Sequence, residues 1–153
     1  MIRLALYQPD IPQNVGAAMR LCACLGIPLD IIQPCGFPWD DRKIRTSGMD
    51  YIDQAVVHRH MNMEAFEKSY PGQRRILMTT KGAIPYTDFV FEPGDILLAG
   101  RESAGVPDDV HHRVDARVVI PMRAETRSLN IIISSAMIVG EALRQIQQQR
   151  MQR

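Results

Sequence analysis

The sequence is poor in the features that define several large protein classes. It has three cysteines among 153 residues, Cys22, Cys24 and Cys35, and none forms a Cys-x-x-Cys pair. This odd set argues against both a disulfide framework and a thiolate zinc site. No apolar run approaches the roughly 20 residues of a membrane span, and the first apolar run is too short for a signal peptide. We therefore expect an untargeted cytoplasmic protein with neither a metal nor a membrane partner.

The chain also lacks an excess of positive charge. Its net charge is +1, whereas a nucleic-acid-binding domain is often strongly basic. Any RNA-binding surface must therefore be local, and small basic clusters are more often only a solvated face. The local basic candidates are Arg42-Lys43-Arg45, Arg74-Arg75 with Lys81, and Arg101, Arg123 and Arg127. Of these, the predicted RNA-binding residues are Arg42, Lys43, Arg45, Arg123 and Arg127.

Several nucleotide-binding and catalytic motifs are missing as well. No Gly-x-Gly-x-x-Gly follows the first apolar run, and no P-loop sequence occurs. The stretch from Gly100 through Ser103 to Gly105 is one residue longer than a nucleophile elbow, which argues against Ser103 as a nucleophile. The histidines have no acidic or cysteine partner at ligand spacing, which favours surface or packed histidines over a metal site.

What is present predicts one α/β domain over residues 1–153. With 46% hydrophobic residues the chain can bury a core, and short apolar runs alternate with helical patterns. The expected strands are 4–7, 29–32, 55–57, 76–78, 96–99 and 118–120. The expected helices are 14–25, a short one after Asp40, 63–70, a short one after Pro107, and a last one from Leu129. This alternation favours a mostly parallel sheet with helices on both faces.

The last helix bears on assembly. Its apolar positions at 129, 132, 133, 136, 137, 140 and 143 predict a face that packs on the sheet, with Ser128 as the N-cap. Ile131, Ile138 and Ala142 form a second apolar strip, which suggests a homodimer partner. Gly140 inside the helix suggests close packing, and the glutamine-rich end is expected to fray.

Three unusual loops follow apolar strands directly. They span residues 79–82, 100–107 and 121–130, and each mixes glycine, proline or hydroxyl residues with charge. Because ligands of parallel sheets bind beyond the carboxyl ends of the strands, we expect the three loops to form one pocket.

The residues of these loops and of the N-terminal run resemble a known family. Tyr7 to Ala17 with Arg20, Leu98 to Pro107, and Ile120-Pro121-Met122 followed by Arg127 to Asn130 are similar to the three motifs of the SPOUT-superfamily RNA 2′-O-ribose methyltransferases. The short tRNA (cytidine/uridine-34) 2′-O-methyltransferase group is the best match, and the resemblance covers nearly the whole chain.

The resemblance implies an α/β fold with a C-terminal trefoil knot that binds S-adenosylmethionine among the knot loops. It implies transfer of the methyl group to a ribose 2′-hydroxyl of tRNA, at cytidine or uridine 34, by a homodimer. Carried over by position, the cofactor-binding residues would be Met78, Thr79, Gly100, Glu102, Gly105, Ile120, Ser128 and Leu129.

The catalytic residues implied by the resemblance are Arg20, Asn14 and Asn130. A guanidinium is essentially always protonated, so Arg20 is a poor general base and suits electrostatic positioning of a phosphate or of the developing alkoxide. For Asn14 and Asn130, helix capping is the competing interpretation. The chain departs from the family pattern at Ile132 and Gly140.

Other functions remain open at this point. The chain could be a noncatalytic RNA- or adenosylmethionine-binding module of the same fold, or a methyltransferase for another RNA site. A domain for a different nucleotide is the third alternative. The residues themselves support a ligand pocket with a modest basic surface.

Overall fold

The computed structural model describes residues 1–48, 54–81 and 83–153, with side chains for all of these except 45–48. Within this part of the chain, seven parallel strands form one sheet. The strands are β1 (Arg3–Tyr7), β2 (Leu29–Ile32), β3 (Val57–His60), β4 (Arg75–Met78), β5 (Ile84–Pro85), β6 (Ile96–Ala99) and β7 (Ala116–Val119). Their order is β3-β2-β1-β6-β4-β7-β5, and every neighbouring pair is parallel. The predicted parallel α/β fold is confirmed.

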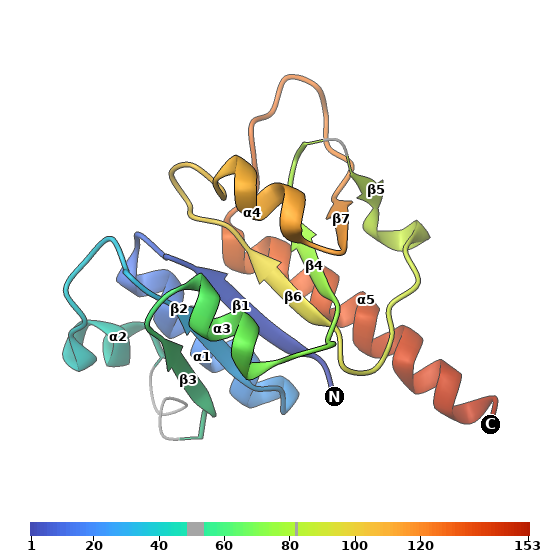
Figure 1. The fold of residues 1–153 in the computed structure, drawn as a ribbon, viewed down its shortest axis with the longest axis horizontal. Helices are drawn as coiled ribbons and strands as arrows, with labels where there is room; N and C mark the ends of the chain where they lie inside the picture. Colours follow the sequence, from blue (N-terminus) through green and yellow to red (C-terminus); the bar gives the residue numbers. More distant parts are fainter. Residues whose placement is uncertain (49–53, 82) are drawn as a thin grey trace.

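Helices cover both faces of the sheet (Figure 1). They are α1 (Pro12–Leu25), α2 (Asp41–Gly48), α3 (Met63–Ser69), α4 (Asp108–Arg113) and α5 (Ile131–Met151), with a short 3-10 turn, η2 (Tyr86–Asp88). One apolar core joins α1, α2 and α5 to one face. A second core packs α3, through Phe66, and α4, through Val110, on the other face. Burial on both faces explains why most strands are continuous apolar runs.

The expected strand at 55–57 is wrong in its position. β3 begins at Val57 and ends at His60, and its two middle residues, His58 and Arg59, are exposed. An edge strand has solvent on one side and tolerates polar side chains, so apolar character did not mark its bounds. The two-residue strand β5 at the other edge was not expected either.

The prediction for the last helix is wrong in which face packs inward. The buried residues of α5 are Ser135, Ile138, Val139, Ala142 and Ile146, so the strip expected to meet a partner faces the core. The face expected on the sheet is only partly buried: Ile132 and Leu143 pack against the core, but the exposed fractions are 39% for Leu129, 55% for Ile133 and 39% for Met137. Both sides of this helix are apolar, so helical periodicity cannot choose between them.

Two further expectations for α5 are wrong. Its N-cap is Asn130 rather than Ser128, because the Asn130 side chain accepts from the backbone N–H groups of Ile132 (2.8 Å) and Ile133 (3.2 Å). A Cβ built at Gly140 meets nothing within 4 Å, so this glycine does not mark close packing within the chain.

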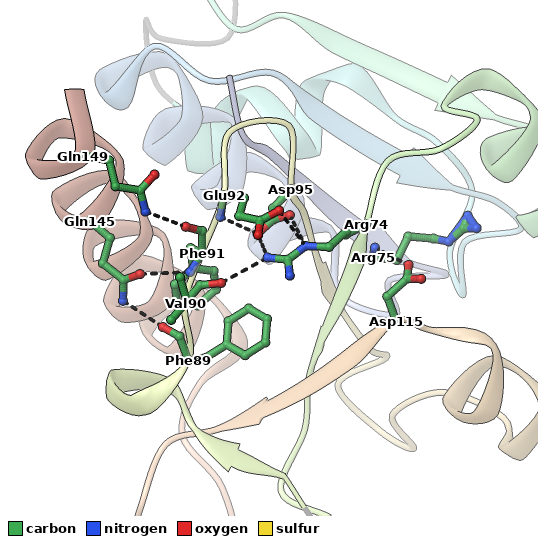
Figure 2. A network of polar contacts seen from close by, with 10 residues as sticks. All are labelled: Arg74, Arg75, Phe89, Val90, Phe91, Glu92, Asp95, Asp115, Gln145 and Gln149. Atoms are coloured by element: carbon green, nitrogen blue, oxygen red, sulfur yellow. Dashed lines mark hydrogen bonds and ion pairs between the residues drawn. The ribbon is translucent and has the colours of Figure 1, made fainter. Parts of the chain in front are cut away.

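The C-terminal half of α5 is anchored rather than frayed (Figure 2). Gln145 accepts from the backbone N–H of Phe91 and donates to the carbonyl of Phe89, both at 2.9 Å. Gln149 donates to the carbonyl of Phe91 at 3.0 Å. The glutamines therefore satisfy backbone groups of a segment outside the described strands, which a count of polar residues cannot reveal.

A fully buried carboxylate lies within the second core. Asp30 of β2 accepts from Arg3 Nε (2.8 Å), His60 Nε2 (2.7 Å) and the Tyr70 hydroxyl (2.6 Å). Burial raises the pKa of the Tyr70 hydroxyl, and the Asp30 carboxylate that it donates to raises it further. The cluster ties β1, β2, β3 and the end of α3 together, which stabilises the sheet away from the loops.

The expected trefoil knot is not tested by strand order and pairing, and it stays a prediction. Among the described residues, no helix combines the length and the apolar character needed to cross a lipid bilayer.

Candidate active site

The three unusual loops meet at one edge of the sheet. Met78 of β4 is in register with Ala99 of β6 and with Val118 of β7, so the carboxyl ends of these three strands lie side by side. Beyond them is a cavity of about 870 Å³, a size typical of small-molecule sites. The expectation of a single pocket formed by these loops is confirmed for the residues described, which leave out Gly82.

All eight residues predicted to bind the cofactor line this cavity, namely Met78, Thr79, Gly100, Glu102, Gly105, Ile120, Ser128 and Leu129. Asn14 and Asn130 line it too. Apolar side chains such as Val118 and Ile138 contribute to the same wall, next to hydroxyl and carboxylate groups. The cavity therefore offers an apolar surface for a flat ring together with hydrogen-bonding groups for a polar ligand.

Hydrogen bonds connect the three sequence motifs through their side chains. Asn14 Nδ2 donates to Glu102 Oε1 at 3.3 Å, and Asn130 Nδ2 donates to Asn14 Oδ1 at 3.5 Å. Asn14 is in the first turn of α1, which begins at Pro12, so its side chain does not cap that helix. Asn130 does cap α5, so its capping role is confirmed while its other end joins this network.

Asp10 closes the second loop onto the N-terminal loop, and it was not singled out in the sequence. Its backbone N–H donates to Glu102 Oε2 at 2.7 Å. Its carboxylate accepts from the Ser103 backbone N–H at 3.2 Å and from the Ser103 hydroxyl. A Cβ on Gly36 would lie 2.6 Å from Asp10 Oδ1, so the segment after β2 packs directly on this carboxylate. No local pattern signals this role, because both hydrogen-bond partners of Asp10 lie more than 90 residues further along the chain.

The backbone of the second loop folds back on itself. Arg101 and Gly105 exchange two backbone hydrogen bonds of 2.9 Å. A Cβ on Gly100 would lie 2.8 Å from the Gly105 backbone, and Gly105 has a φ of +64°. Both glycines are therefore required by geometry: the first by close approach and the second by the left-handed backbone.

The basic residues predicted from the sequence lie outside this cavity. Arg20 is exposed on α1, and Arg42 and Lys43 are exposed on α2. Arg123 and Arg127 are exposed in the third loop, and the side chain of Arg45 lies outside the described residues. Arg123 is 3.8 Å from Glu125, a pair too exposed to contribute measurable stability.

Two other basic candidates from the sequence, Lys81 and Arg101, do line the cavity, together with Asp108 and His111. The Arg101 Nε donates to the Gly105 carbonyl at 3.2 Å, which holds the guanidinium over the second loop. Within the residues described, no three histidine, cysteine, aspartate or glutamate side chains come together as metal ligands.

The fold and the cavity define a parallel α/β domain that takes its ligand in three loops at the carboxyl edge of the sheet. The chain belongs to the SpoU rRNA Methylase family, whose profile matches residues 1–140. This confirms the resemblance seen in the three motifs.

Individual relatives match over almost the whole chain. A tRNA (cytidine(34)-2′-O)-methyltransferase of Beijerinckia indica is 58% identical, over 94% of this chain and 91% of the relative. One of Escherichia coli K12 is 38% identical, over 95% and 94%. A solved structure described as giving insights into the 2-OH methylation of C/U34 on tRNA superimposes with a TM-score of 0.90 at 38% identity, covering 95% of both chains.

Proposed function

We propose that the protein transfers a methyl group from S-adenosylmethionine to the ribose 2′-hydroxyl of the wobble nucleotide, cytidine or uridine 34, of tRNA. The observation that carries the proposal is the cavity at the ends of β4, β6 and β7, whose three loops are joined through Asn14, Glu102 and Asn130. The relatives that match nearly all of this chain are tRNA methyltransferases for the same nucleotide, which supports the substrate.

The cavity fits the proposed methyl donor. Its volume of about 870 Å³ leaves room for a nucleoside-sized ligand and part of a second substrate. Ile120 and Met78 supply apolar surface for an adenine ring, and the second loop contributes Gly100 to Val106 to the same cavity. When bound, the donor supplies an electrophilic methyl group on a positively charged sulfur.

The reaction requires alignment more than covalent chemistry from the protein. The ribose oxygen bonds to the methyl carbon while the carbon–sulfur bond breaks, its electron pair stays on sulfur, and the hydroxyl proton leaves to solvent. Holding the two reactants in line converts a bimolecular step into an effectively unimolecular one. In this chain the Glu102–Asn14–Asn130 network fixes the loops that would do so. We assign positioning roles to both asparagines because their side-chain atoms already bind one another and their neighbours.

Arg20 is proposed to contact a phosphate of the bound RNA. It is exposed on α1 and does not line the cavity, so it cannot act from within the donor site of its own chain. A permanently charged guanidinium there stabilises negative charge on the RNA and leaves proton removal to another group. Arg42, Lys43, Arg45, Arg123 and Arg127 are proposed to add weaker contacts to the RNA backbone.

We also propose that the protein is a cytoplasmic homodimer that uses the exposed face of α5. Ile133 and Met137 on one side of this helix, and Leu129 just before it, remain open in the single chain. Ile11, which lines the same cavity as Leu129, is also 41% exposed. A contiguous apolar strip of this kind is typical of a protein interface. Gly140 on the same side leaves space for a close approach by a second chain.

Light scattering tests the dimer with a matched pair of substitutions. Ile133→Glu places a charge in the strip and is expected to halve the mass in solution. Val90→Glu places the same charge at another exposed apolar residue, 65% open, and is expected to keep the dimer mass. A wild-type protein with the mass of one chain would refute the dimer.

Methyl transfer tests the reaction and the substrate together. Labelled S-adenosylmethionine is incubated with tRNA that lacks wobble 2′-O-methylation, and the nucleosides are then analysed. We expect 2′-O-methylcytidine or 2′-O-methyluridine at position 34, and Arg20→Ala is expected to bind the donor but lose nearly all transfer. Donor binding without transfer to any tRNA would favour a noncatalytic module, and label at another nucleotide would show a different RNA site.

A further inference from the structure

A stacked pair of side chains has no part in the function proposed above. The guanidinium carbon of Arg59 lies 4.1 Å from the centroid of the Trp39 ring. The Gln33 amide oxygen, when turned toward Arg59, accepts from its Nε at 2.9 Å and its Nη2 at 3.2 Å. The Trp39 indole N–H donates to Asp41 Oδ1 at 3.1 Å. Both planar groups are therefore held in place, while Arg59 is exposed to solvent.

This pair adjoins the loops of the cavity. The segment that carries Trp39 follows β2 and is fastened to the N-terminal loop by a 2.9 Å bond from the Gly36 N–H to the Pro9 carbonyl. Cys35 in the same segment interacts electrostatically with both Arg59 and the cavity residue Glu102. Burial raises the pKa of its thiol, the charge of Arg59 lowers it and the charge of Glu102 raises it. The stacked pair and the cavity thus belong to one edge of the sheet.

We propose that the outer face of the Arg59 guanidinium, stacked on Trp39, is a binding site for one unpaired nucleobase of the RNA substrate, next to the nucleotide in the cavity. The inference rests on the proposed function for its substrate. A planar guanidinium offers a flat, weakly hydrated surface on which a base can stack, and proteins that read single-stranded RNA use arginine and aromatic planes in this way. Because Gln33 already fixes the plane, little conformational freedom remains to be lost on binding.

The charges around the pair favour a base over a phosphate. Asp41 is hydrogen-bonded to Trp39, so a carboxylate lies beside the stacked pair. Its negative charge opposes the approach of a phosphate but has little effect on stacking, which depends on contact between planes. The site therefore suits a splayed loop base rather than the backbone of a duplex.

Trp39 supplies a direct optical test, because it is the only tryptophan in the chain. Full-length protein is titrated with an anticodon stem–loop RNA while tryptophan emission is recorded, with S-adenosylmethionine alone as the control. We expect RNA to change the emission in parallel with binding measured by an independent method, and the donor alone to leave it unchanged. Unchanged emission at saturating RNA, with the stem–loop or with total tRNA, would overturn the proposal.

Two substitutions separate stacking from charge. Arg59→Lys keeps the charge but has no plane, so both Arg59→Lys and Arg59→Ala should raise the KM for RNA by about tenfold, the scale of one base stack. The affinity for the donor should not change. Arg150→Lys, an exposed arginine near the end of α5, is the matched control and should behave as wild type. Full activity of Arg59→Lys would show that charge suffices and would overturn the stacking site.

An abasic stem–loop tests whether Arg59 binds the base next to the wobble nucleotide. Removing the base next to the wobble nucleotide should weaken binding by wild type but add little to the defect of Arg59→Ala. These binding measurements do not depend on methylation. RNA binding that changes Trp39 emission without methyl transfer would therefore support the stacking site and refute the proposed reaction. Efficient methyl transfer by Arg59→Ala with a normal KM for RNA would support the proposed reaction and refute the stacking site.

Discussion

Replacing the buried carboxylate Asp30 by asparagine should strongly destabilise the fold. Asp30 is fully buried and accepts through Oδ2 from Arg3 Nε and through Oδ1 from Arg3 Nη2, His60 and Tyr70. An asparagine oxygen can keep the three bonds at Oδ1, but its NH₂ group then faces the Nε–H of Arg3, donor against donor. Removing one partner of a buried ion pair costs about 3–5 kcal/mol, and we expect the lower end because the Arg3 side chain is 16% exposed and can regain water.

Urea unfolding followed by circular dichroism at one fixed protein concentration measures this cost. A loss of about 3 kcal/mol with an m-value of about 2 kcal/mol/M lowers the midpoint by roughly 1.5 M. Asp109→Asn is the matched control, because its carboxylate is 67% exposed and its pair with Arg113 should contribute less than about 0.5 kcal/mol. Equal midpoints for the Asp30 and Asp109 variants would refute the reasoning.

Three further perturbations follow from the same structure. At pH 8 an alkylating reagent should label exposed Cys24 in the native protein but label Cys22 only after unfolding. The reason is that burial raises the pKa of the Cys22 thiol to about 12. Labelling of Cys22 in the native protein, detected by peptide mass spectrometry, would contradict this. The hydrogen bond from Arg144 lowers the pKa of Glu141 to about 2, so its stabilisation is present above the unfolded value of about 4.3 and is lost as pH falls toward 2. In urea titrations the difference between wild type and Glu141→Gln should therefore vanish over that range, and a constant difference would contradict it. Gly36→Ala places a new Cβ 2.6 Å from the Asp10 carboxylate, which must therefore move. We expect stability to fall by about 1–3 kcal/mol and donor binding to weaken in calorimetry. Unchanged donor affinity would show that this packing does not shape the cavity.

The parts of the fold that could be predicted were those with one dominant cause. Runs such as Ile96 to Ala99 are buried on both faces, so their apolar character marked a central parallel strand. Glycine and proline beyond the strand ends marked loops that the structure brings into one cavity. For these loops, local composition and the rule that ligands bind beyond the carboxyl ends of parallel strands predicted the same place. The residues predicted to bind the cofactor all line that cavity.

The errors arose where two local solutions were equally good. Ser128 and Asn130 are both good N-cap residues, and the structure uses Asn130. Asn130 also donates to Asn14, which is distant in sequence and so could not be considered in a local pattern. The two apolar sides of α5 have comparable periodicity, so tertiary packing selected the one with Ile138. Asp10 was missed because its partner Ser103 lies 93 residues away, beyond the reach of any local pattern.

Because the bond between Asn130 and Asn14 lies at the cavity, we expect the proposed methyl donor to lengthen the lifetime of the protein. The bond spans 116 residues and joins the starts of the first and last helices, so the cavity is complete only when both ends of the chain have docked. A ligand that binds only this closed form stabilises it by mass action, by about 2.7 kcal/mol at a hundred times its dissociation constant. We expect the α5 amides to exchange with solvent more slowly when the donor is bound. A cell short of donor would therefore hold a larger open fraction of the enzyme, with its last helix accessible to proteases.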